Sequence, residues 1–505
     1  MVLYFQFDAL ERDASGLFDL VRSMKNTFAP INRTPPEILS LIPDYLEDDD
    51  RDKNLIVLTH VCHSWREIFI SRPSLWTRLD LGNVEKTQVY IERSKSIPLE
   101  IHLDPSYEEE AFLLAIPHIR RLKTLSVHGD SDELLPVLVE HFSCPLPLLV
   151  DLKVNLERYY DDVSTLPHEP FNGDLSSLRE LTLIGVVTPL PWRDLPNLTT
   201  LKLHDVPEHR ILLTQLLDFF ESAPYLRHIE LHDSLPSSSN APTERVVSLP
   251  HLKDLSINAE RPHSILLNHL SIPARASLHL EFKFDNKHSQ ISSHLPESPG
   301  SLRNLSHITA VNLRFGPLER YIRLNGPSGE LYILGTWSRG EEQPNVRASR
   351  VIQYLGQFDI SRTRWLTITL CSYRPSNPAR IAKSRLYRTL HCMEDLRMLT
   401  LIQCEYIPFV HALNPNKNPD KVVLCPRLEE IVIYTCLRNP LYADELVDMA
   451  EERALRGAKL SAIKLVGVDI VAGSAEGVSL PLSERAKCVE YKFDGTWPEW
   501  DTLPG

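Results

Sequence analysis

The chain has 505 residues, of which 43% are apolar and 24% are charged, and its net charge at pH 7 is −13. This composition is typical of a globular protein or of one long repeat array, and so acidic a chain would repel a polyphosphate backbone, which argues against nucleic acid as a partner. No stretch approaches the roughly 18 continuous apolar residues of a membrane helix, and the first residues lack the pattern of a secretory signal. We therefore expect no membrane partner and a location in the cytoplasm and/or the nucleus.

The residue types that bind metals and nucleotides form no motif in this sequence. The eight cysteines include no C-x-x-C pair and match no disulfide framework, so we interpret them as thiols. Glycine is scarce, at 18 residues, and neither a P-loop nor a G-x-G-x-x-G motif occurs. Scattered Ser, His and Asp residues carry no signal for a catalytic triad, which is recognised by geometry. The sequence predicts no cofactor, no metal site and no catalytic residue.

Residues 1–30 carry apolar side chains at helical spacing, which predict an amphipathic helix interrupted near Gly16. The apolar positions are Leu10, Leu17, Val21, Met24 and Phe28. Two interpretations of this face are open: packing against the following part of the same chain, or self-association.

The next stretch, "TPPEILSLIPDY", begins like a helix. Thr34 can accept a hydrogen bond from the backbone of Glu37, whose side chain can reach back, and Pro35 can occupy the first turn without losing a bond. Pro43 would remove a hydrogen bond inside a helix, so we expect a kink or break near Ile42.

After an acidic loop, apolar residues advance by threes and fours and predict a second helix of about four turns with one apolar face. Its apolar residues are Leu55, Leu58, Val61, Cys62, Trp65, Ile68 and Phe69. So small a helical unit cannot bury a stable core alone, and it therefore needs a surface to pack on.

These motifs resemble the F-box family. "PPEIL", "VCHSWRE" and "SLW" stand in the family's order and spacing over residues 31–80, and they look most like the F-box proteins of mushroom-forming fungi. Thr34 stands where the family has Leu, and His63 where it has a basic residue. The resemblance implies a helical domain that binds a Skp-type adaptor. The residues that it assigns to adaptor contact, or to holding the motif together, are Pro35, Ile38, Leu39, Ile42, Leu58, Val61 and Trp65.

From about residue 75 onward one pattern recurs, in which the first, fourth and sixth residues of a short segment are apolar. This pattern predicts about sixteen short strands. The clearest copies begin at residues 122, 149, 178, 198, 226, 252, 308, 396, 428 and 460, and weaker copies lie near 79, 101, 280, 333, 368 and 491. Segments with helical spacing lie between them, at 212–223, 346–358 and 442–457. Each strand can bury one face only if the next strand stacks beside it in parallel, so the pattern predicts an α/β solenoid.

This pattern resembles the leucine-rich repeat, L-x-x-L-x-L-x-x-N/C, in which the ninth position is buried. Cys404 and Cys436 fall on that position, and we interpret them as buried structural thiols. The resemblance implies an α/β fold, in which the small helical F-box is followed over residues 81–505 by an irregular horseshoe solenoid of parallel strands. Long polar insertions fit rim loops or part of a binding face. Trp497 and Trp500 would form a C-terminal cap.

An F-box followed by leucine-rich repeats resembles the substrate-receptor subunit of an SCF-type ubiquitin ligase. The resemblance implies a non-catalytic protein of the protein-degradation pathway that binds a Skp-type adaptor, through it a cullin scaffold, and a target protein on its repeats. An alternative is a stand-alone repeat scaffold for protein interactions, whose F-box-like region only caps the solenoid.

Side chains between the strand leucines face the concave surface of such a solenoid, because successive residues of a strand alternate. Histidines recur there, where they could bind an acidic or phosphorylated segment or respond to pH, although unrelated solvated histidines would give the same pattern. The target contacts predicted on this face are His128, Lys153, Lys202, His204, Glu230, His232 and Asn312.

Overall fold

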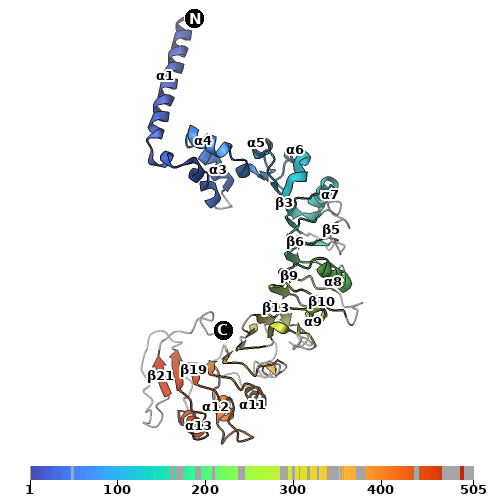
Figure 1. Cartoon of the computed structure of the whole chain (residues 1–505), viewed down its shortest axis with the longest axis vertical. Coiled ribbons are helices and arrows are strands. Elements are labelled where there is room, and N and C mark those ends of the chain that lie inside the picture. Colours follow the sequence, from blue (N-terminus) through green and yellow to red (C-terminus); the bar gives the residue numbers. More distant parts are fainter. Residues whose placement is uncertain are drawn as a thin grey trace. The chain divides into compact units, whose positions relative to one another are not determined.

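The structure is a computed structural model in which the chain forms two compact units, Met1–Glu180 and Leu181–Gly505 (Figure 1). A helical region at the start of the first unit is followed by a mixed α/β region rich in parallel strands. The residues that the structure describes are 2–46, 51–142, 144–157, 164–166, 175–187, 195–206, 211–236, 245–284, 294–297, 302–305, 307–315, 319–326, 329–337, 352, 355–356, 358–370, 383–436, 443–468 and 489–493.

The described part of the first unit opens with seven helical segments. These are α1 (Val2–Thr27), η1 (Pro30–Arg33), α2 (Pro36–Leu39), η2 (Ile42–Tyr45), α3 (Arg51–Thr59), α4 (His63–Ile70) and η4 (Pro73–Trp76). Helix α1 continues through Gly16, so the interruption predicted there is wrong. A single glycine in a helix interior costs only about 1 kcal/mol, which a long helix tolerates. The described side chains of α1 are all exposed, so the predicted packing of this helix against its own chain is not seen for them.

The start of α2 differs from the prediction. The helix begins at Pro36 with Pro35 as its N-cap, and among the described residues no side chain caps it. The predicted capping pair of Thr34 and Glu37 is therefore wrong, because Thr34 instead closes η1. The break predicted near Pro43 is confirmed: this proline occupies the first turn of η2, where its missing N–H removes no hydrogen bond.

The single helix predicted from Leu55 to Phe69 is also wrong. Helix α3 ends at Thr59, and Cys62 is an extended residue that forms the N-cap of α4. The break allows α3 and α4 to pack on each other and to bury Leu55 and Phe69 in one core. Periodicity continued across the break because both helices present an apolar face to the same core.

The rest of the first unit alternates strands and helices: β1 (Arg78–Asp80), α5 (Val84–Ser94), β2 (Leu99–Leu103), α6 (Glu109–Ala115), η5 (Ile116–Arg121), β3 (Leu122–Asp130), α7 (Ser131–His141), β4 (Asp151–Glu157) and β5 (Ser164–Thr165). Strands β1, β2, β3 and β4 pair in parallel in that order. Leu79, Ile101, Leu125 and Leu152 stand side by side in this register, and all four are buried. The alternation of buried and exposed residues along each strand is that of a sheet with one covered face.

The second unit contains the remaining strands: β6 (Glu180–Ile184), β7 (Val186–Val187), β8 (Thr200–His204), β9 (His228–His232), β10 (Val247–Ser248), β11 (Asp254–Asn258), β12 (Leu270–Ser271), β13 (Ser277–Phe284), β14 (Ala310–Phe315), β15 (Glu319–Asn325), β16 (Glu330–Trp337), β17 (Trp365–Leu370), β18 (Met398–Ile402), β19 (Glu430–Cys436), β20 (Ala462–Val468) and β21 (Val489–Phe493). Its described helices are α8 (Leu213–Ser222), α9 (Ser264–Leu267), η10 (Arg303–Leu305), α11 (Lys383–His391), α12 (Ile407–Leu413) and α13 (Ala443–Leu455). Every segment predicted as a strand is a strand, and the helices predicted at 212–223 and 442–457 are α8 and α13. Most of the helix predicted at 346–358 lies outside the described residues.

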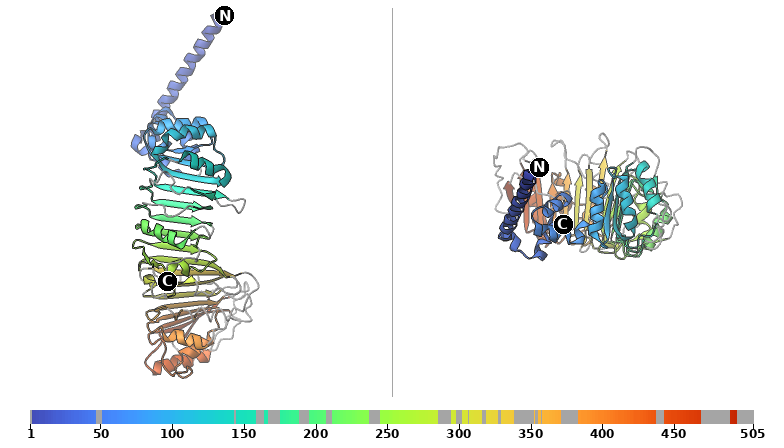
Figure 2. Two further views of the ribbon diagram at one scale, coloured as in Figure 1. Left: turned by 90° about the vertical axis from the view of Figure 1, so that its right-hand side faces the viewer. Right: turned by 90° about the horizontal axis from the view of Figure 1, so that it is seen from above.

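The strands of the second unit lie side by side as a ladder (Figure 2). Hydrogen-bonded neighbours follow the order β8, β9, β11, β13, β16, β15, β14, β17, β18, β19, β20 and β21. One continuous row of buried apolar side chains crosses this ladder, namely Leu203, Leu231, Ile257, Leu280, Ile333, Ile322, Leu313, Ile368, Leu401, Ile433 and Leu465. This row is the core that the repeated leucines predicted.

Strand β15 departs from the predicted all-parallel order. It pairs antiparallel with both β14 and β16, so β16 rather than β14 lies beside β13. Its connections to β14 and β16 are short, and short connections join antiparallel strands, whereas parallel strands need a long crossover. A Cβ atom on Gly329, just before β16, would lie 2.6 Å from the carbonyl oxygen of Ala276, so this position accepts only glycine.

A left-handed residue follows several strands at the eighth position of the repeat, namely Gly185, Asp205, Asp233 and Gln403. Each donates its backbone N–H to the end of the next strand, as Asp233 does to Asn258 O at 2.7 Å. The ninth residue then turns inward. Cys404 is buried, and its Sγ lies 3.2 Å from Ile368 O, which confirms its predicted place. The side chain of Cys436, like Trp497 and Trp500, lies outside the described residues.

Ser234 occupies the same ninth position, which the consensus did not reveal because it names only Asn or Cys there. Its Oγ accepts from Val206 N at 3.1 Å and donates to His232 O at 2.7 Å. A small buried polar side chain thus satisfies the turn backbone in this repeat too. None of the helices that the structure describes has the length and apolarity required to span a membrane.

Candidate protein-interaction sites

The helices around residues 31–80 enclose two tryptophans. Trp65 is 7% exposed, donates from Nε1 to Asn32 Oδ1 at 2.7 Å, and packs edge-on against Phe69. Trp76 is 1% exposed and donates from Nε1 to Phe69 O at 3.0 Å. Both indole N–H groups therefore have a partner within the chain, and both rings belong to the interior of this region.

The structure divides the predicted adaptor contacts into three groups. Leu39 and Trp65 are buried, so they hold the region together. Ile42 and Leu58 are half-buried. Ile38 and Val61 are 54% and 51% exposed, and Pro35 is exposed as well. Only this last group, with part of the second, is available to a partner.

Further apolar side chains of the same helices are exposed, and sequence reasoning did not single them out as contacts. They are Ile31, Leu41, Tyr45, Ile56 and Val57. Together with Pro35, Ile38 and Val61 they form what we call the apolar surface. Helix α2 packs on α4, and η2 packs on α3, so the elements that carry this surface are neighbours. So many exposed apolar groups on a small helical region indicate an interaction surface.

Arg72 fixes the orientation of α2 and η2. Its guanidinium donates to the carbonyl oxygen of Ser40 and, at 3.0 Å, to Asp44 Oδ2. These bonds connect the segment after α4 to the residues that follow Ile38 and Leu41. These bonds therefore fix the backbone of the segment that carries Ile38 and Leu41.

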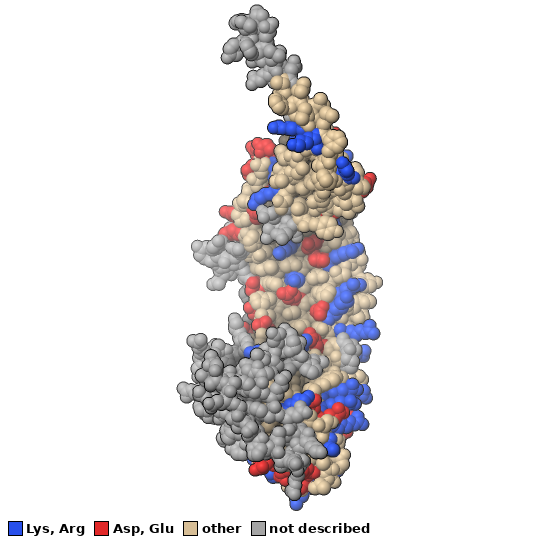
Figure 3. All heavy atoms as spheres, turned by 90° about the vertical axis from the view of Figure 1, so that its left-hand side faces the viewer, with Lys and Arg blue, Asp and Glu red and all other residues tan. Residues whose placement is uncertain are grey.

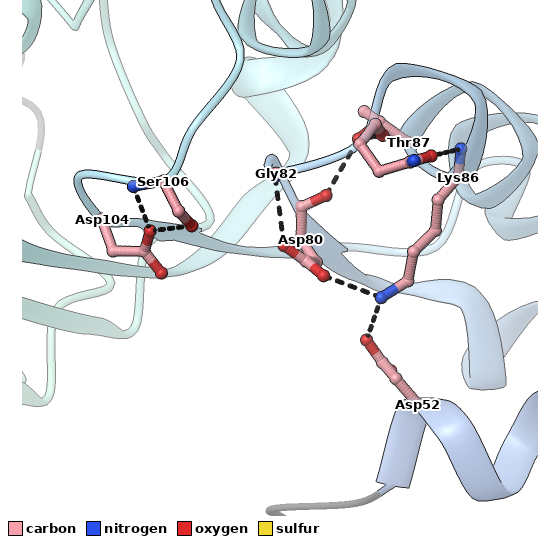
Figure 4. A network of polar contacts seen from close by, with 8 residues as sticks. Asp52, Asp80, Gly82, Lys86, Thr87, Asp104 and Ser106 are labelled. Atoms are coloured by element: carbon pink, nitrogen blue, oxygen red, sulfur yellow. Dashed lines mark hydrogen bonds and ion pairs between the residues drawn. The ribbon is translucent and has the colours of Figure 1, made fainter.

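Lys86 joins the helical region to the first strand. Its Nζ lies 2.8 Å from Asp52 Oδ2 on α3 and 2.8 Å from Asp80 Oδ2 on β1 (Figure 4). Burial raises the pKa of Asp80, but the hydrogen bonds from Lys86 and from the Gly82 backbone outweigh it, so this pKa lies below its ordinary value. Burial likewise lowers the pKa of Lys86, and its bonds to Asp52 and Asp80 raise it above the ordinary value. Asp80 and Lys86 are therefore both ionised near neutral pH.

The turns after β1 and β2 are built alike, which Figure 4 also shows. Asp80 Oδ1 accepts from Gly82 N at 3.1 Å, and Asp104 Oδ1 accepts from Ser106 N at 2.8 Å. Trp76, which precedes β1, packs edge-on against Tyr90 of α5, which follows the first turn. The helical region thus continues into the strand region through packed side chains rather than through a loose linker.

Replacing Lys86 with methionine should destabilise the first unit by about 1.5–3 kcal/mol, the usual worth of hydrogen bonds to charged groups, because Asp52 and Asp80 would face each other without a cation. Urea unfolding followed by circular dichroism measures this change. Lys123→Met, at an exposed lysine on β3, is the matched control and should change stability by less than about 0.5 kcal/mol. Equal unfolding curves for the two variants would contradict the role of Lys86.

Four of the predicted target contacts do lie together, on β8 and β9. Lys202 stands opposite Glu230, and His204 opposite His232. Glu230 accepts from Lys202 Nζ at 2.9 Å and lies 3.1 Å from His204 Nε2. Burial lowers the pKa of His204, so its imidazole is neutral at pH 7. Because Lys202 is paired with Glu230, the charges of these two side chains offset each other.

The other predicted contacts lie on other strands. His128 lies on β3 and accepts from Asn155 Nδ2 at 3.0 Å, and Lys153 lies on β4, both in the first unit. Asn312 lies on β14 between Arg323 and Thr367. On the face drawn in Figure 3, many Lys and Arg side chains lie along one edge, and Asp and Glu side chains lie mostly inward of that edge. The structure therefore brings four of the seven predicted contacts together on β8 and β9 and places the other three on β3, β4 and β14.

Two carboxylates adjoin the β8–β9 group. Ligand atoms of Asp205, His232 and Asp233 all lie within 4.8 Å of one another. Carboxylate and imidazole are ligand types for a divalent cation, but both carboxylates are exposed and the Asp205 carboxylate already lies 3.8 Å from the His232 ring. The sequence placed these aspartates directly after His204 and His232, and the left-handed turns bring them back to the strand ends.

Comparison with known proteins gives one result for the helical region. Residues 31–82 match the model of the family described as F-box-like. No curated protein matches the chain. The matched range begins at Ile31, ends two residues beyond the predicted boundary at 80, and includes both tryptophans and the whole apolar surface. Domains of this family generally bind Skp-type adaptors, and the chain carries such an F-box-like domain at residues 31–82.

Proposed function

We propose that this protein is the substrate-receptor subunit of an SCF-type ubiquitin ligase. Residues 31–82 would bind a Skp-type adaptor and, through it, a cullin scaffold, while the strand region would bind the protein to be degraded. The observation that carries this proposal is the apolar surface: the F-box-like domain keeps its tryptophans inside and leaves Ile38, Val61 and Tyr45 exposed. An adaptor helix that covers these side chains would complete the small core.

We further propose that the strand region is an irregular leucine-rich-repeat solenoid. Parallel strands in register, leucines in continuous rows, and left-handed turns followed by a buried Cys or Ser all support this assignment. In this proposal the solenoid is a non-catalytic recognition surface, and the F-box is of the mushroom type that its motifs resemble. The cytoplasm and/or the nucleus would be its place of action.

The connection between the two parts fits such a receptor. Lys86 joins α3 to β1, and Trp76 packs between the F-box-like domain and α5. A receptor brings a target lysine to the ubiquitin-charged enzyme by holding the target at a fixed place, which raises its effective concentration. A rigid connection serves this purpose better than a flexible one.

The test is binding of the full-length protein to a Skp-type adaptor by calorimetry, with the double variant Ile38→Asp, Val61→Asp. Both side chains are half exposed, so the variant should fold. We expect the dissociation constant to rise at least about 100-fold, because two lost apolar anchors are worth roughly 1.5–2 kcal/mol each and 1.4 kcal/mol is a factor of ten. Leu39 and Trp65 are unsuitable for this test, since a charge in their buried positions would unfold the domain.

Val139→Asp, Leu148→Asp is the matched control. These side chains are 44% and 46% exposed in the same unit and lie outside the F-box-like domain, so adaptor binding should be unchanged. A folded wild-type protein that does not bind the adaptor would favour the second candidate, a stand-alone repeat scaffold whose F-box-like domain only caps the strands. The packing of Trp76 against α5 is the observation that supports this capping role.

A further inference from the structure

Helix α1 carries an unbroken heptad pattern. Apolar or small residues recur at alternating steps of four and three along the helix, and once more at Phe28 directly after its last residue, namely at Leu3, Phe7, Leu10, Ala14, Leu17, Val21, Met24 and Phe28. The pattern extends over about four heptads, which is the signature of a coiled-coil strand. We call these positions the seam of α1.

The described part of the seam has no cover. Leu17 is 66% exposed, Val21 is 54%, Met24 is 58% and Phe28 is 70%. Leu20, beside the seam, is 61% exposed as well. A helix that leaves so much apolar surface in water gains stability by pairing, since helices in water are stabilised mainly by packing of their apolar face. The seam therefore requires a partner helix of similar length.

We propose that α1 pairs with α1 of a second copy of this chain in an antiparallel two-stranded coiled coil. This inference is independent of the ligase assignment, because it concerns residues that precede the F-box-like domain. The seam matches itself in length and spacing. In the antiparallel register the layers would pair Leu3 with Phe28, Phe7 with Met24, Leu10 with Val21, and Ala14 with Leu17 of the other copy.

Layer volume favours the antiparallel over the parallel arrangement. A parallel pair would place Ala14 opposite Ala14 and Phe7 opposite Phe7. It would thus leave a void in one layer and overfill another. The antiparallel register places the small Ala14 against Leu17 and gives layers of similar volume, as close packing requires.

Charge favours the same arrangement. The first half of α1 carries three acids, Asp8, Glu11 and Asp13, against the single base Arg12. The second half carries two bases, Arg22 and Lys25, against the single acid Asp19. Antiparallel pairing sets the acidic half of one copy beside the basic half of the other, and it also opposes the two helix dipoles.

The resulting dimer would present two F-box-like domains and two strand surfaces in one particle. Two linked recognition surfaces raise the effective concentration for a target that carries two copies of a motif, without any new contact. Dimerisation would thus act on avidity and leave the affinity of each surface unchanged.

Light scattering of the full-length protein at micromolar concentration tests the proposal. We expect twice the mass of one chain for the wild type and the mass of one chain for Leu17→Glu, Val21→Glu, which puts charges into the seam. Ser15→Glu, Ser23→Glu adds the same charges to the outer face of α1 and should remain dimeric. A monomeric wild type, or a seam variant that stays dimeric, overturns the proposal. Unchanged thermal unfolding of the strand region shows that each variant is folded.

A charge exchange tests the orientation. Glu11→Lys, Asp13→Lys makes both halves basic and should weaken an antiparallel dimer. The further exchange Arg22→Glu, Lys25→Glu restores opposite charges across the antiparallel pair, and the dimer should return. In a parallel pair the fourfold variant would set like charges side by side, so loss of the dimer in this variant overturns the antiparallel arrangement.

Discussion

Replacing Arg453 with methionine is expected to destabilise the second unit by about 3–5 kcal/mol. The side chain of Arg453 is fully buried, and among the described residues its guanidinium pairs with no carboxylate. Its guanidinium donates to Leu424 O at 2.7 Å and to Cys425 O at 2.8 Å, and it approaches Leu413 O at 3.4 Å. Hydrogen bonds to a charged group are worth roughly 1.5–3 kcal/mol each, and the substitution would leave the carbonyl groups buried without a donor.

Arg453 connects α13 to two earlier parts of the chain, the end of α12 and the loop that follows it. It lies on α13, Leu413 ends α12, and Leu424 and Cys425 belong to the loop before β19. Burial lowers the pKa of the guanidinium, but an arginine remains protonated in proteins, so the charge persists in the interior. The carbonyl dipoles are what compensate for its desolvation.

Chemical unfolding of the full-length protein measures the effect. Arg456→Met is the matched control: Arg456 directly follows the last residue of α13, is exposed, also bonds the loop between α12 and β19, and should contribute less than about 1 kcal/mol. Arg453→Lys should lie between the two, because an ammonium group keeps the charge but cannot span the carbonyl groups as a planar fork does. Equal unfolding midpoints for Arg453→Met and Arg456→Met would contradict this role.

The second unit is also expected to lose stability as the pH falls from about 6.5 toward 4. His263 and His294 are buried, with ring centres 4.7 Å apart, and His294 stacks on Phe282 at 3.6 Å. Burial lowers the pKa of His263 to about 4 and that of His294 to about 3, and the nearby His263 contributes to the latter. The unfolded chain takes up these protons near pH 6.5, whereas the folded chain does so only at lower pH.

The sign of the effect follows from this difference. Since the unfolded state binds more protons between pH 6.5 and 4, stability rises with pH in that window by about 1.4 kcal/mol per pH unit for each histidine. The stabilisation is complete above pH 6.5 and is lost as the pH falls through the window. Unfolding free energies measured between pH 7.5 and 4.5 test it.

His294→Phe keeps a ring on Phe282 and removes one titrating group. We expect the pH slope to fall by about 1.4 kcal/mol per unit in this variant, with little change of stability at pH 7.5. His307→Phe, at an exposed histidine, is the control and should leave the slope as in the wild type. A wild-type slope in His294→Phe would show that acid acts on other groups.

Much of the chain could be predicted from local pattern. Each strand of a stacked array must repeat the same alternation of apolar residues. The spacing of the leucines therefore predicted all the long strands between β1 and β21 except β15. The order "PPEIL", "VCHSWRE" and "SLW" located the F-box-like domain to within two residues, because a domain so small depends on a few fixed side chains. Strand β15 was not predicted, because its residues alternate but lack the leading leucine of the repeat.

The candidate site could be predicted only in part. Periodicity places Leu39 and Ile38 near one another but does not say which of them the rest of the domain covers, and packing decides that Leu39 is 3% and Ile38 54% exposed. Periodicity also predicted one continuous helix across Cys62, where the chain is extended and a new helix begins. On the strands, the sequence aligned His204 with His232, and only the register showed that Lys202 pairs with Glu230.

The sequence by itself therefore determined the positions of the repeat strands, the F-box-like motif and the helical character of the first residues, because each depends on spacing along one segment. Tertiary structure alone decided which apolar side chains remain exposed, where β15 inserts, and which carbonyl groups Arg453 reaches. These features depend on segments that are far apart in the chain. Burial and hydrogen bonding at one residue are set by what packs against it, and no local pattern records that neighbour.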